Sequence, residues 1–173
     1  MNKGEERETI RIAGVVRESI VDGPGLRFVI FGQGCPHHCQ ECHNEETWDF
    51  EGGYDCEIKK ILDAIDENPL LDGVTFSGGE PFSQPGQFAA IGREVKKKNL
   101  NITTFTGFVY EKLLADSQNN PEISELLEVT DILIDGPYLK SERDLTLKFR
   151  GSRNQRVIDL NNTQKSGEIV LWD

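Results

Sequence analysis

The feature that most constrains this chain is a loop with three closely spaced cysteines, Cys35, Cys39 and Cys42. Three residues separate the first pair and two separate the second, so the thiolates reach one metal centre only if the loop wraps around it. Pro36 fixes its own φ, and Gly34 allows a tight bend just before the loop. The spacing therefore predicts a metal-binding loop.

Two kinds of metal centre fit these residues. A structural zinc site closes with four ligands, and His37, His38 or His43 could supply the fourth. Zinc ligands, however, usually come as two short-spaced pairs, and the remaining Cys56 has no partner at such a spacing. An iron–sulfur cubane held by three thiolates leaves one iron open to a small molecule. The residues favour this open-site cluster and leave zinc as the alternative.

Composition excludes several classes of protein. The chain has 173 residues and is expected to form one domain over 1–173, with 1–9 as a loose tail. Its 19 Lys and Arg against 30 Asp and Glu give a net charge of −11, which argues against nucleic acid or an anionic membrane as partner. It contains neither an apolar run of about 18 residues nor the apolar core of a signal peptide. Clustered cysteines in such a chain predict a metal and a cytoplasmic location.

The apolar pattern predicts strands that alternate with helices. The continuous apolar run at 26–32 suits a strand buried on both faces of a parallel sheet. The cysteine loop begins just past the carboxyl end of this strand, where α/β sheets place ligands. A complete eight-fold barrel needs about 250 residues. We therefore predict an α/β fold that is an open, partial (βα) barrel, with a mostly parallel sheet and helices on its outer face.

The other elements are assigned in the same way. Further strands are expected at 10–16, 73–77, 100–105 and 131–135, a helix at 85–98, and one broken or two short helices over 109–129. Asp55 is predicted to cap a helix that ends near Asn68, which places Cys56 in its first turn as a partly buried thiol. The segments 156–160 and 168–172 are predicted to form a hairpin around Asn161-Asn162.

A second loop follows the predicted strand at 73–77. Its glycines, Gly78 and Gly79, let the backbone approach a ligand closely, and Glu80 offers a carboxylate that could meet an ammonium group. Asp135 ends the strand at 131–135 and thus falls at the same edge of the sheet. Asp135 is predicted either to contact the ligand or to hydrogen-bond within its loop.

Together, Cys-x3-Cys-x2-Cys and Ser77-Gly78-Gly79-Glu80-Pro81 resemble the radical S-adenosylmethionine enzymes. A finer resemblance is to the activating proteins of anaerobic ribonucleotide reductase, and it covers about residues 10–160. It rests on Val21-Asp22-Gly23-Pro24-Gly25, on Cys42-His43-Asn44 with Thr47-Trp48, on the segment from Asp131 to Tyr138, and on Arg150-Gly151-Ser152 with Asn154-Gln155-Arg156.

The resemblance implies a 4Fe-4S cluster held by Cys35, Cys39 and Cys42, with S-adenosyl-L-methionine bound to the fourth iron. One electron then cleaves the carbon–sulfur bond and gives methionine and a 5′-deoxyadenosyl radical. The protein orients the cofactor and excludes water and oxygen. No catalytic residue is expected beyond the cluster and the cofactor.

The resemblance also implies which residues surround the cofactor. Gly78, Gly79 and Glu80 would hold the amino group of S-adenosylmethionine. The remaining predicted cofactor-binding residues are Glu41, Cys42, His43 and Asp135. Glu41 stands where many superfamily members carry an aromatic residue that is interpreted as an adenine contact.

The implied partner is the large subunit of anaerobic ribonucleoside-triphosphate reductase, on which the radical would generate a glycyl radical. A low-potential donor such as flavodoxin or ferredoxin would supply the electron. The basic segment 148–156 is hypothesised to face the reductase. The alternatives are an activase of another glycyl radical enzyme such as pyruvate formate-lyase, a small-molecule radical S-adenosylmethionine enzyme, and a non-catalytic zinc module.

Overall fold

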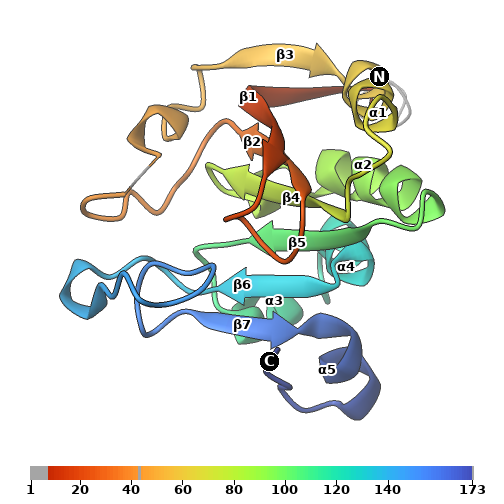
Figure 1. The fold of residues 1–173 in the computed structure, drawn as a ribbon. Helices are drawn as coiled ribbons and strands as arrows, with labels where there is room; N and C mark the ends of the chain where they lie inside the picture. The colour runs from red at the N-terminus through yellow and green to blue at the C-terminus, as the bar shows by residue number, and fades with distance from the viewer. Residues whose placement is uncertain (1–7, 43, 173) are drawn as a thin grey trace.

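The computed structural model describes residues 8–42 and 44–172. Across these residues the chain forms one seven-stranded sheet in the order β3-β1-β2-β4-β5-β6-β7 (Figure 1). The four central strands, which are parallel to one another, are β2 (Arg27–Gly32), β4 (Gly73–Gly78), β5 (Asn101–Phe105) and β6 (Ile132–Asp135). Antiparallel strands flank them, namely β1 (Thr9–Ser19), β3 (Tyr54–Glu57) and β7 (Arg156–Asp159). The predicted α/β class with an open, mostly parallel sheet is confirmed.

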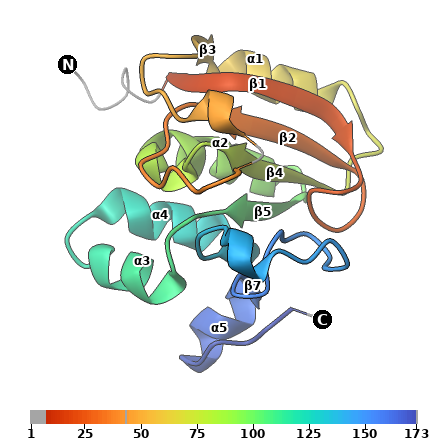
Figure 2. The ribbon, with the colours of Figure 1, turned by 90° about the vertical axis from the view of Figure 1, so that its left-hand side faces the viewer.

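Five helices accompany the described part of the sheet. They are α1 (Ile58–Asp66), α2 (Pro85–Lys97), α3 (Tyr110–Asp116), α4 (Pro121–Val129) and α5 (Leu160–Ser166). Figure 2 shows α2, α3 and α4 gathered beside the sheet rather than across its strand ends. The prediction of two short helices over 109–129 is confirmed, and Asn120 caps the second by accepting a hydrogen bond from the Glu122 N–H. None of the described helices has the length and apolar composition of a membrane span.

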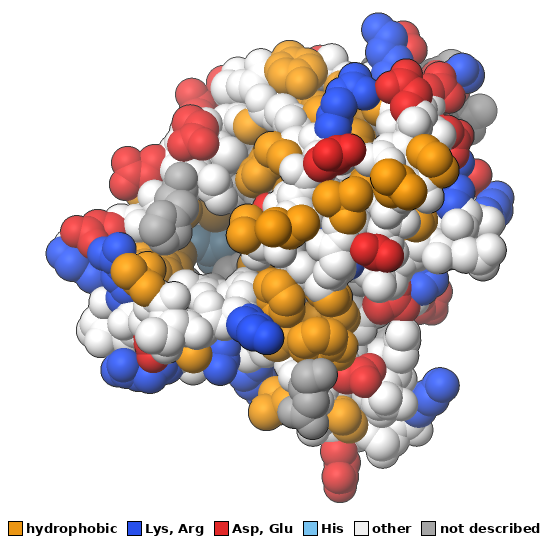
Figure 3. Space-filling view, in the orientation of Figure 1, with side chains coloured by type: hydrophobic (Ala, Val, Ile, Leu, Met, Phe, Trp, Pro, Cys, Tyr) orange, Lys and Arg blue, Asp and Glu red, His pale blue; other side chains and the backbone are white. Residues whose placement is uncertain are grey.

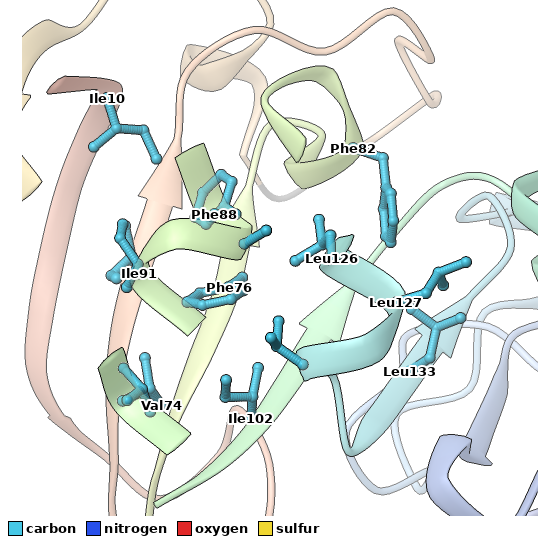
Figure 4. Close-up of a cluster of buried hydrophobic side chains, with 14 of the residues drawn as sticks. Ile10, Val74, Phe76, Phe82, Phe88, Ile91, Ile102, Leu126, Leu127 and Leu133 are labelled. Atoms are coloured by element: carbon cyan, nitrogen blue, oxygen red, sulfur yellow. The ribbon is translucent and has the colours of Figure 1, made fainter. Parts of the chain in front are cut away.

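The core lies between the helices and one face of the sheet. Phe76 of β4 and Phe88 of α2 have ring centroids 4.8 Å apart, and Ile91, Ile102 and Leu126 surround them (Figure 4). Because successive side chains of a strand point to opposite faces, the neighbours of these core residues point the other way. The opposite face of the sheet is therefore free to line a cavity.

The loops that carry the predicted site leave the sheet at one edge. Gly32 at the end of β2 pairs with Gly78 at the end of β4, so the cysteine loop and the Gly-Gly-Glu loop start side by side. The ends of β5 and β6 follow along the same edge, on the left in Figure 1. This convergence follows from parallel pairing alone, because parallel strands end on the same side of a sheet.

Two predicted elements are wrong. Asp55 does not cap a helix: Tyr54–Glu57 form β3, in which Cys56 pairs with Ile10, and the helix starts only at Ile58. The 11-residue strand β1 offers a free edge to this segment, and the pairing prevails over the local capping preference. Cys56 is partly buried, as expected, but from a strand.

The predicted hairpin around Asn161-Asn162 is also wrong. The carboxylate of Asp159 accepts a hydrogen bond from the Asn162 N–H at 3.0 Å and thereby caps α5, which ends at Gly167 in a left-handed conformation. The two segments do meet antiparallel, through a bridge between Ile158 and Leu171 and through hydrogen bonds from the Asp159 N–H to the Val170 carbonyl and from the Trp172 N–H to the Val157 carbonyl. The asparagine pair thus lies in the first turn of a helix and not in a β-turn.

Candidate functional site

A cavity of about 570 Å³ lies at the carboxyl edge of the parallel strands. Phe31, Ser77 and Phe105 of the sheet form its floor, and Thr106 and Gly107 follow directly after β5. The loop residues 144–151 and the turn at Val21 form its outer walls. In Figure 3 a hollow opens at the left of the molecule, and a histidine side chain is visible inside it.

The cysteine loop is anchored at both ends. The Gly34 N–H donates to the Thr47 carbonyl at 2.7 Å, and the Cys35 N–H donates to the Trp48 carbonyl at 3.1 Å. The first residues of the loop are thus hydrogen-bonded to the segment that follows it. Gly34 has a φ of +104°, and a Cβ on it would overlap the ring of Phe50. The tight bend predicted at Gly34 thus has two physical causes, the backbone conformation and the packed ring.

All three cysteines of the loop line the cavity. Cys35 is buried, and Cys39 and Cys42 are partly buried. Burial is the largest cause that raises the pKa of the Cys35 and Cys39 thiols above the ordinary value of 9.0. A metal centre would therefore have to displace protons from these thiols, and metal binding at this loop releases protons.

The donor set fits a cluster better than a single ion. Across residues 8–42 and 44–172, no three His, Cys, Asp or Glu side chains converge on a point that one metal ion could occupy. In a cubane each thiolate binds a different iron, so three thiolates from one loop leave the fourth iron open, whereas a structural zinc ion needs four ligands at about 2.0–2.3 Å. His37 faces Glu80 and His38 stacks on Trp48, and His43 lies outside the described residues.

Gly78 and Gly79 line the cavity and lie directly against the cysteine loop. Gly78 has a φ of +90°, and a Cβ on it would meet the Gly32 nitrogen at 2.6 Å. A Cβ on Gly79 would overlap the Gly34 carbonyl oxygen. The sequence predicted close approach to a ligand at these glycines. The structure adds a close approach to the neighbouring backbone, because the Gly79 N–H donates to the Gly32 carbonyl at 2.9 Å.

Glu80 is buried at 1 % exposure beside this loop. Its carboxylate accepts hydrogen bonds from the hydroxyl of Thr106 and from the Gly107 N–H, and it lies 2.6 Å from His37 Nε2. The residues that line the cavity include Gly79 but not Glu80. Contact between Glu80 and an ammonium group stays a prediction.

The other predicted cofactor-binding acids lie apart from the cavity lining. Glu41 is exposed, and its carboxylate pairs with Lys140 Nζ at 2.8 Å, which lowers the pKa of Glu41. Asp135 is buried and accepts hydrogen bonds from the Tyr110 N–H and from the guanidinium of Arg156. His43 lies outside the described residues. The roles assigned to these residues stay predictions.

Sequence reasoning missed a buried arginine that supports the site. Arg27 is fully buried and donates from Nε to Thr75 Oγ1 at 2.7 Å and from Nη1 to the Pro24 carbonyl at 2.7 Å. The Thr75 hydroxyl in turn donates to the Asp22 carbonyl at 2.8 Å, which fixes the turn that brings Val21 to the cavity. Burial lowers the pKa of Arg27 to about 10, so it remains a cation at neutral pH. The one sequence feature that could have indicated this role is that Arg27 closely follows the turn Gly23-Pro24-Gly25.

Four further cavity residues had different signals in the sequence. Phe31 and Phe105 alternate with core residues in their strands, so their direction could have been predicted from the period of two. Leu147 and Phe149 come from a segment that has no regular pattern, and nothing local indicated that it folds over the strand ends.

The fold and this site define an α/β protein with a thiol-lined cavity at the carboxyl ends of parallel strands. A family model described as a 4Fe-4S single cluster domain matches residues 21–158, and the chain belongs to this family. The prediction that it resembles the reductase-activating proteins of the radical S-adenosylmethionine superfamily is confirmed.

Two relatives are similar to the chain in sequence, and one solved structure matches part of it. The chain is 33% identical over 147 residues to an anaerobic ribonucleoside-triphosphate reductase-activating protein of Vibrio cholerae, across 80% of this chain and 90% of the relative. It is 33% identical over 159 residues to a pyruvate formate-lyase 1-activating enzyme of Escherichia coli, across 88% of this chain and 61% of the relative. The crystal structure of QueE from Escherichia coli matches with a TM-score of 0.47 at 16% identity, across 61% of this chain and 57% of that chain.

Proposed function

We propose that this protein is a radical S-adenosylmethionine activase that generates a glycyl radical on anaerobic ribonucleoside-triphosphate reductase. The observation that carries the proposal is the single cavity onto which Cys35, Cys39, Cys42 and the Gly78-Gly79 backbone all open. The 33% identity to the Vibrio cholerae reductase-activating relative over 147 residues adds support.

In this proposal the three thiolates hold a 4Fe-4S cluster, which when bound supplies the electron for reductive cleavage of S-adenosyl-L-methionine. The backbone at Gly78 and Gly79 holds the cofactor against the cysteine loop. Phe31 and Phe105 exclude water from the floor of the cavity. An external low-potential donor such as flavodoxin or ferredoxin provides the electron, in the cytoplasm, where thiols persist in reduced form.

The rim of the cavity supports a protein substrate rather than a small molecule. Val21 and Leu145 both line the cavity, and they are 71% and 78% exposed. Apolar side chains at the mouth of the cavity would leave water when a protein docks there. A backbone segment of the reductase would enter between these two loops.

A second candidate is an activase of pyruvate formate-lyase. The observation in its favour is the 33% identity to the Escherichia coli pyruvate formate-lyase 1-activating enzyme across 88% of this chain. The chain spans 61% of the length of that relative.

One anaerobic experiment separates the candidates. The protein is reconstituted with iron and sulfide, reduced, and given S-adenosylmethionine together with either the reductase or pyruvate formate-lyase. We expect 5′-deoxyadenosine in both mixtures and a glycyl radical, detected by electron paramagnetic resonance, only on the reductase.

The other outcomes each favour a different function. A radical only on pyruvate formate-lyase would replace the first candidate with the second. Release of 5′-deoxyadenosine with a radical on neither protein would indicate a small-molecule radical enzyme. Stoichiometric zinc without 5′-deoxyadenosine would indicate a zinc module.

A further inference from the structure

The carboxylate of Glu80 is enclosed entirely by protein groups, with its side chain 0% exposed. One oxygen lies 2.6 Å from His37 Nε2 and 2.8 Å from the Gly107 nitrogen. The other lies 3.0 Å from the Phe82 nitrogen, and the Thr106 hydroxyl is within 3.0 Å of both oxygens. Each of these distances is that of a normal or short hydrogen bond.

These donors occupy the lone pairs with which the Glu80 carboxylate accepts hydrogen bonds. An ionised carboxylate has about four lone-pair sites. The groups on His37, Phe82, Thr106 and Gly107 fill that number within the described residues. An ammonium group that approached Glu80 would have to displace one of them. The geometry therefore commits this carboxylate to the protein.

Three of these four donors come from two other segments, the cysteine loop and the turn after β5, whereas the Phe82 N–H is two residues from Glu80. His37 belongs to the cysteine loop and is 43 residues from Glu80, and Thr106 follows β5 and is 26 residues away. His37, Thr106 and Gly107 all line the cavity. A second connection is parallel to the first, because the Glu80 N–H donates to the Gly34 carbonyl at 2.8 Å. Glu80 thus joins the cysteine loop to the end of β5.

Packing gives the His37 ring a single orientation. A Cβ on Gly107 would overlap this ring, so the ring lies directly over the Gly107 backbone. Its other contact is edge-on to Phe108, with ring centroids 4.5 Å apart. His37 stands between Cys35 and Cys39 in the chain. A fixed ring at this point therefore fixes the path of the loop between the two thiols.

We propose that His37 and Glu80 form a clasp that holds the cysteine loop in its metal-binding shape before metal binds. Both are positioning residues, and the thiols alone bind the metal. The proposal rests on the proposed function only in that Cys35, Cys39 and Cys42 receive the cluster. A loop that is already ordered does not lose that conformational entropy when the cluster is inserted, and a cluster within it is released more slowly.

The test uses His37→Phe, Glu80→Gln and the double variant, with His38→Phe as the matched control. Phenylalanine keeps an aromatic ring at 37 and removes the donor. His38 is the next residue in the chain, is exposed, and stacks on Trp48 with centroids 4.6 Å apart. Two quantities are measured: amide hydrogen exchange of residues 35–42 in the metal-free protein, and the rate of iron loss to a chelator from the reconstituted protein.

We expect His37→Phe and Glu80→Gln each to speed both processes about tenfold, as suits a lost hydrogen bond to a charged group. The double variant should be no faster than the faster single variant, because both changes break one connection. The control should stay within about twofold of the wild type. Thr106→Val, which removes a different donor to Glu80, should act in the same direction and covers the case in which Glu80→Gln fails to fold.

Two results would overturn the clasp. The first is that amide hydrogen exchange of residues 35–42 and iron loss stay unchanged in both single variants. If Glu80→Gln alone then weakens S-adenosylmethionine binding, Glu80 is a contact of the cofactor. The other is fully additive effects in the double variant, which would mean that the two residues act separately. Exchange in the metal-free protein needs no cofactor. A clasp that is present in a protein producing no 5′-deoxyadenosine would therefore refute the proposed function and leave the clasp standing.

Discussion

Two buried carboxylates, Glu80 and Asp135, stand at the carboxyl ends of two parallel strands, yet their surroundings differ. Glu80 is held by the cavity-lining residues His37, Thr106 and Gly107 and by the backbone N–H of Phe82 two residues away. Asp135 is held chiefly by Arg156 of the neighbouring strand β7. Parallel pairing brings both acids to one edge of the sheet, but their partners decide whether they support the cavity or the sheet margin.

The Asp135 region is an ion-pair cluster that joins three elements. Arg156 contacts Asp135 of β6 and also pairs with Glu111 of α3 at 2.8 Å. The hydrogen bonds that Arg156 donates to Asp135 and then to Glu111 are the largest causes that raise the pKa of Arg156, so its guanidinium is charged at every accessible pH. Arg156 was counted in the basic segment hypothesised to face the partner, but its charge is paired with the buried Asp135 and the exposed Glu111.

The largest expected effect tests whether the cysteine loop, which Glu80 contacts, holds the cluster. Changing Cys35, Cys39 or Cys42 to Ala should abolish the cluster absorbance and the cleavage of S-adenosylmethionine, because a cubane on two thiolates is poorly held. Cys56→Ala, in strand β3, is the control and should keep both. Iron content and 5′-deoxyadenosine are measured. Loss of the cluster in Cys56→Ala with one cysteine of the loop dispensable would contradict the ligand assignment.

The next effect concerns stability on the Asp135 side. Asp135→Asn leaves Arg156 without its buried partner and should lower the free energy of unfolding by about 2–3 kcal/mol, less than for a fully buried pair because Arg156 is 31% exposed. Urea unfolding of the metal-free protein measures it. Asp63→Asn is the control and should change stability by less than about 0.5 kcal/mol, because its pair with Lys59 is exposed.

Cofactor binding by folded Asp135→Asn distinguishes its two predicted roles. We expect the affinity for S-adenosylmethionine to match the wild type. Weakened binding at unchanged stability would instead make Asp135 a contact of the cofactor. Asp135 would then serve the cavity and not only the sheet margin, which contradicts the contrast with Glu80.

A smaller effect concerns the basic segment 148–156, whose last residue, Arg156, pairs with Asp135. Replacing Arg150 and Arg153 together with Ala should reduce glycyl-radical formation about threefold more than S-adenosylmethionine cleavage, because rim charges govern the rate of encounter with the partner. Added salt should slow wild-type association in the same sense. Radical and 5′-deoxyadenosine are measured at matched cluster content.

The single variants sharpen this prediction. Arg150 lines the cavity and donates to the Gln155 carbonyl, so Arg150→Ala should also loosen its own loop. Arg153 is exposed, so Arg153→Ala should affect encounter alone. Equal losses of radical and 5′-deoxyadenosine in Arg153→Ala would show that it serves the cofactor or the fold, and no loss in either would show a solvated edge.

The smallest effect is a pH dependence in the ion-pair cluster. The hydrogen bond from Arg156 lowers the pKa of Glu111 below its ordinary value of 4.5. A carboxyl with a depressed pKa stabilises the fold above its unfolded-state pKa, and this contribution is lost as the pH falls through the folded-state pKa. Because Glu111 is 59% exposed, Glu111→Gln should cost only about 0.5 kcal/mol at neutral pH.

Urea unfolding of wild type and Glu111→Gln at neutral pH and below the folded-state pKa checks this sign. The difference in the free energy of unfolding should disappear in acid. A difference that persists there would mean that Glu111 acts through packing and not through its charge.

The sequence alone determined the features that depend on local pattern. The spacing of Cys35, Cys39 and Cys42 is a property of eight consecutive residues. The apolar runs of the central strands, each followed by its loop, likewise predicted a mostly parallel sheet with the site at the carboxyl ends of its strands. Residues close in the chain stay close in any fold, so such motifs can be identified without the structure.

Only the tertiary structure decided which groups meet. Pairing with β1 turned the expected first turn of a helix into β3, and a cap by Asp159 turned an expected hairpin into α5. Glu80 meets Thr106 and His37 from 26 and 43 residues away, and Arg156 reaches Asp135 from 21 residues away. A carboxylate has the same chemistry at either strand end, so its role depends on donors that only chain folding brings to it.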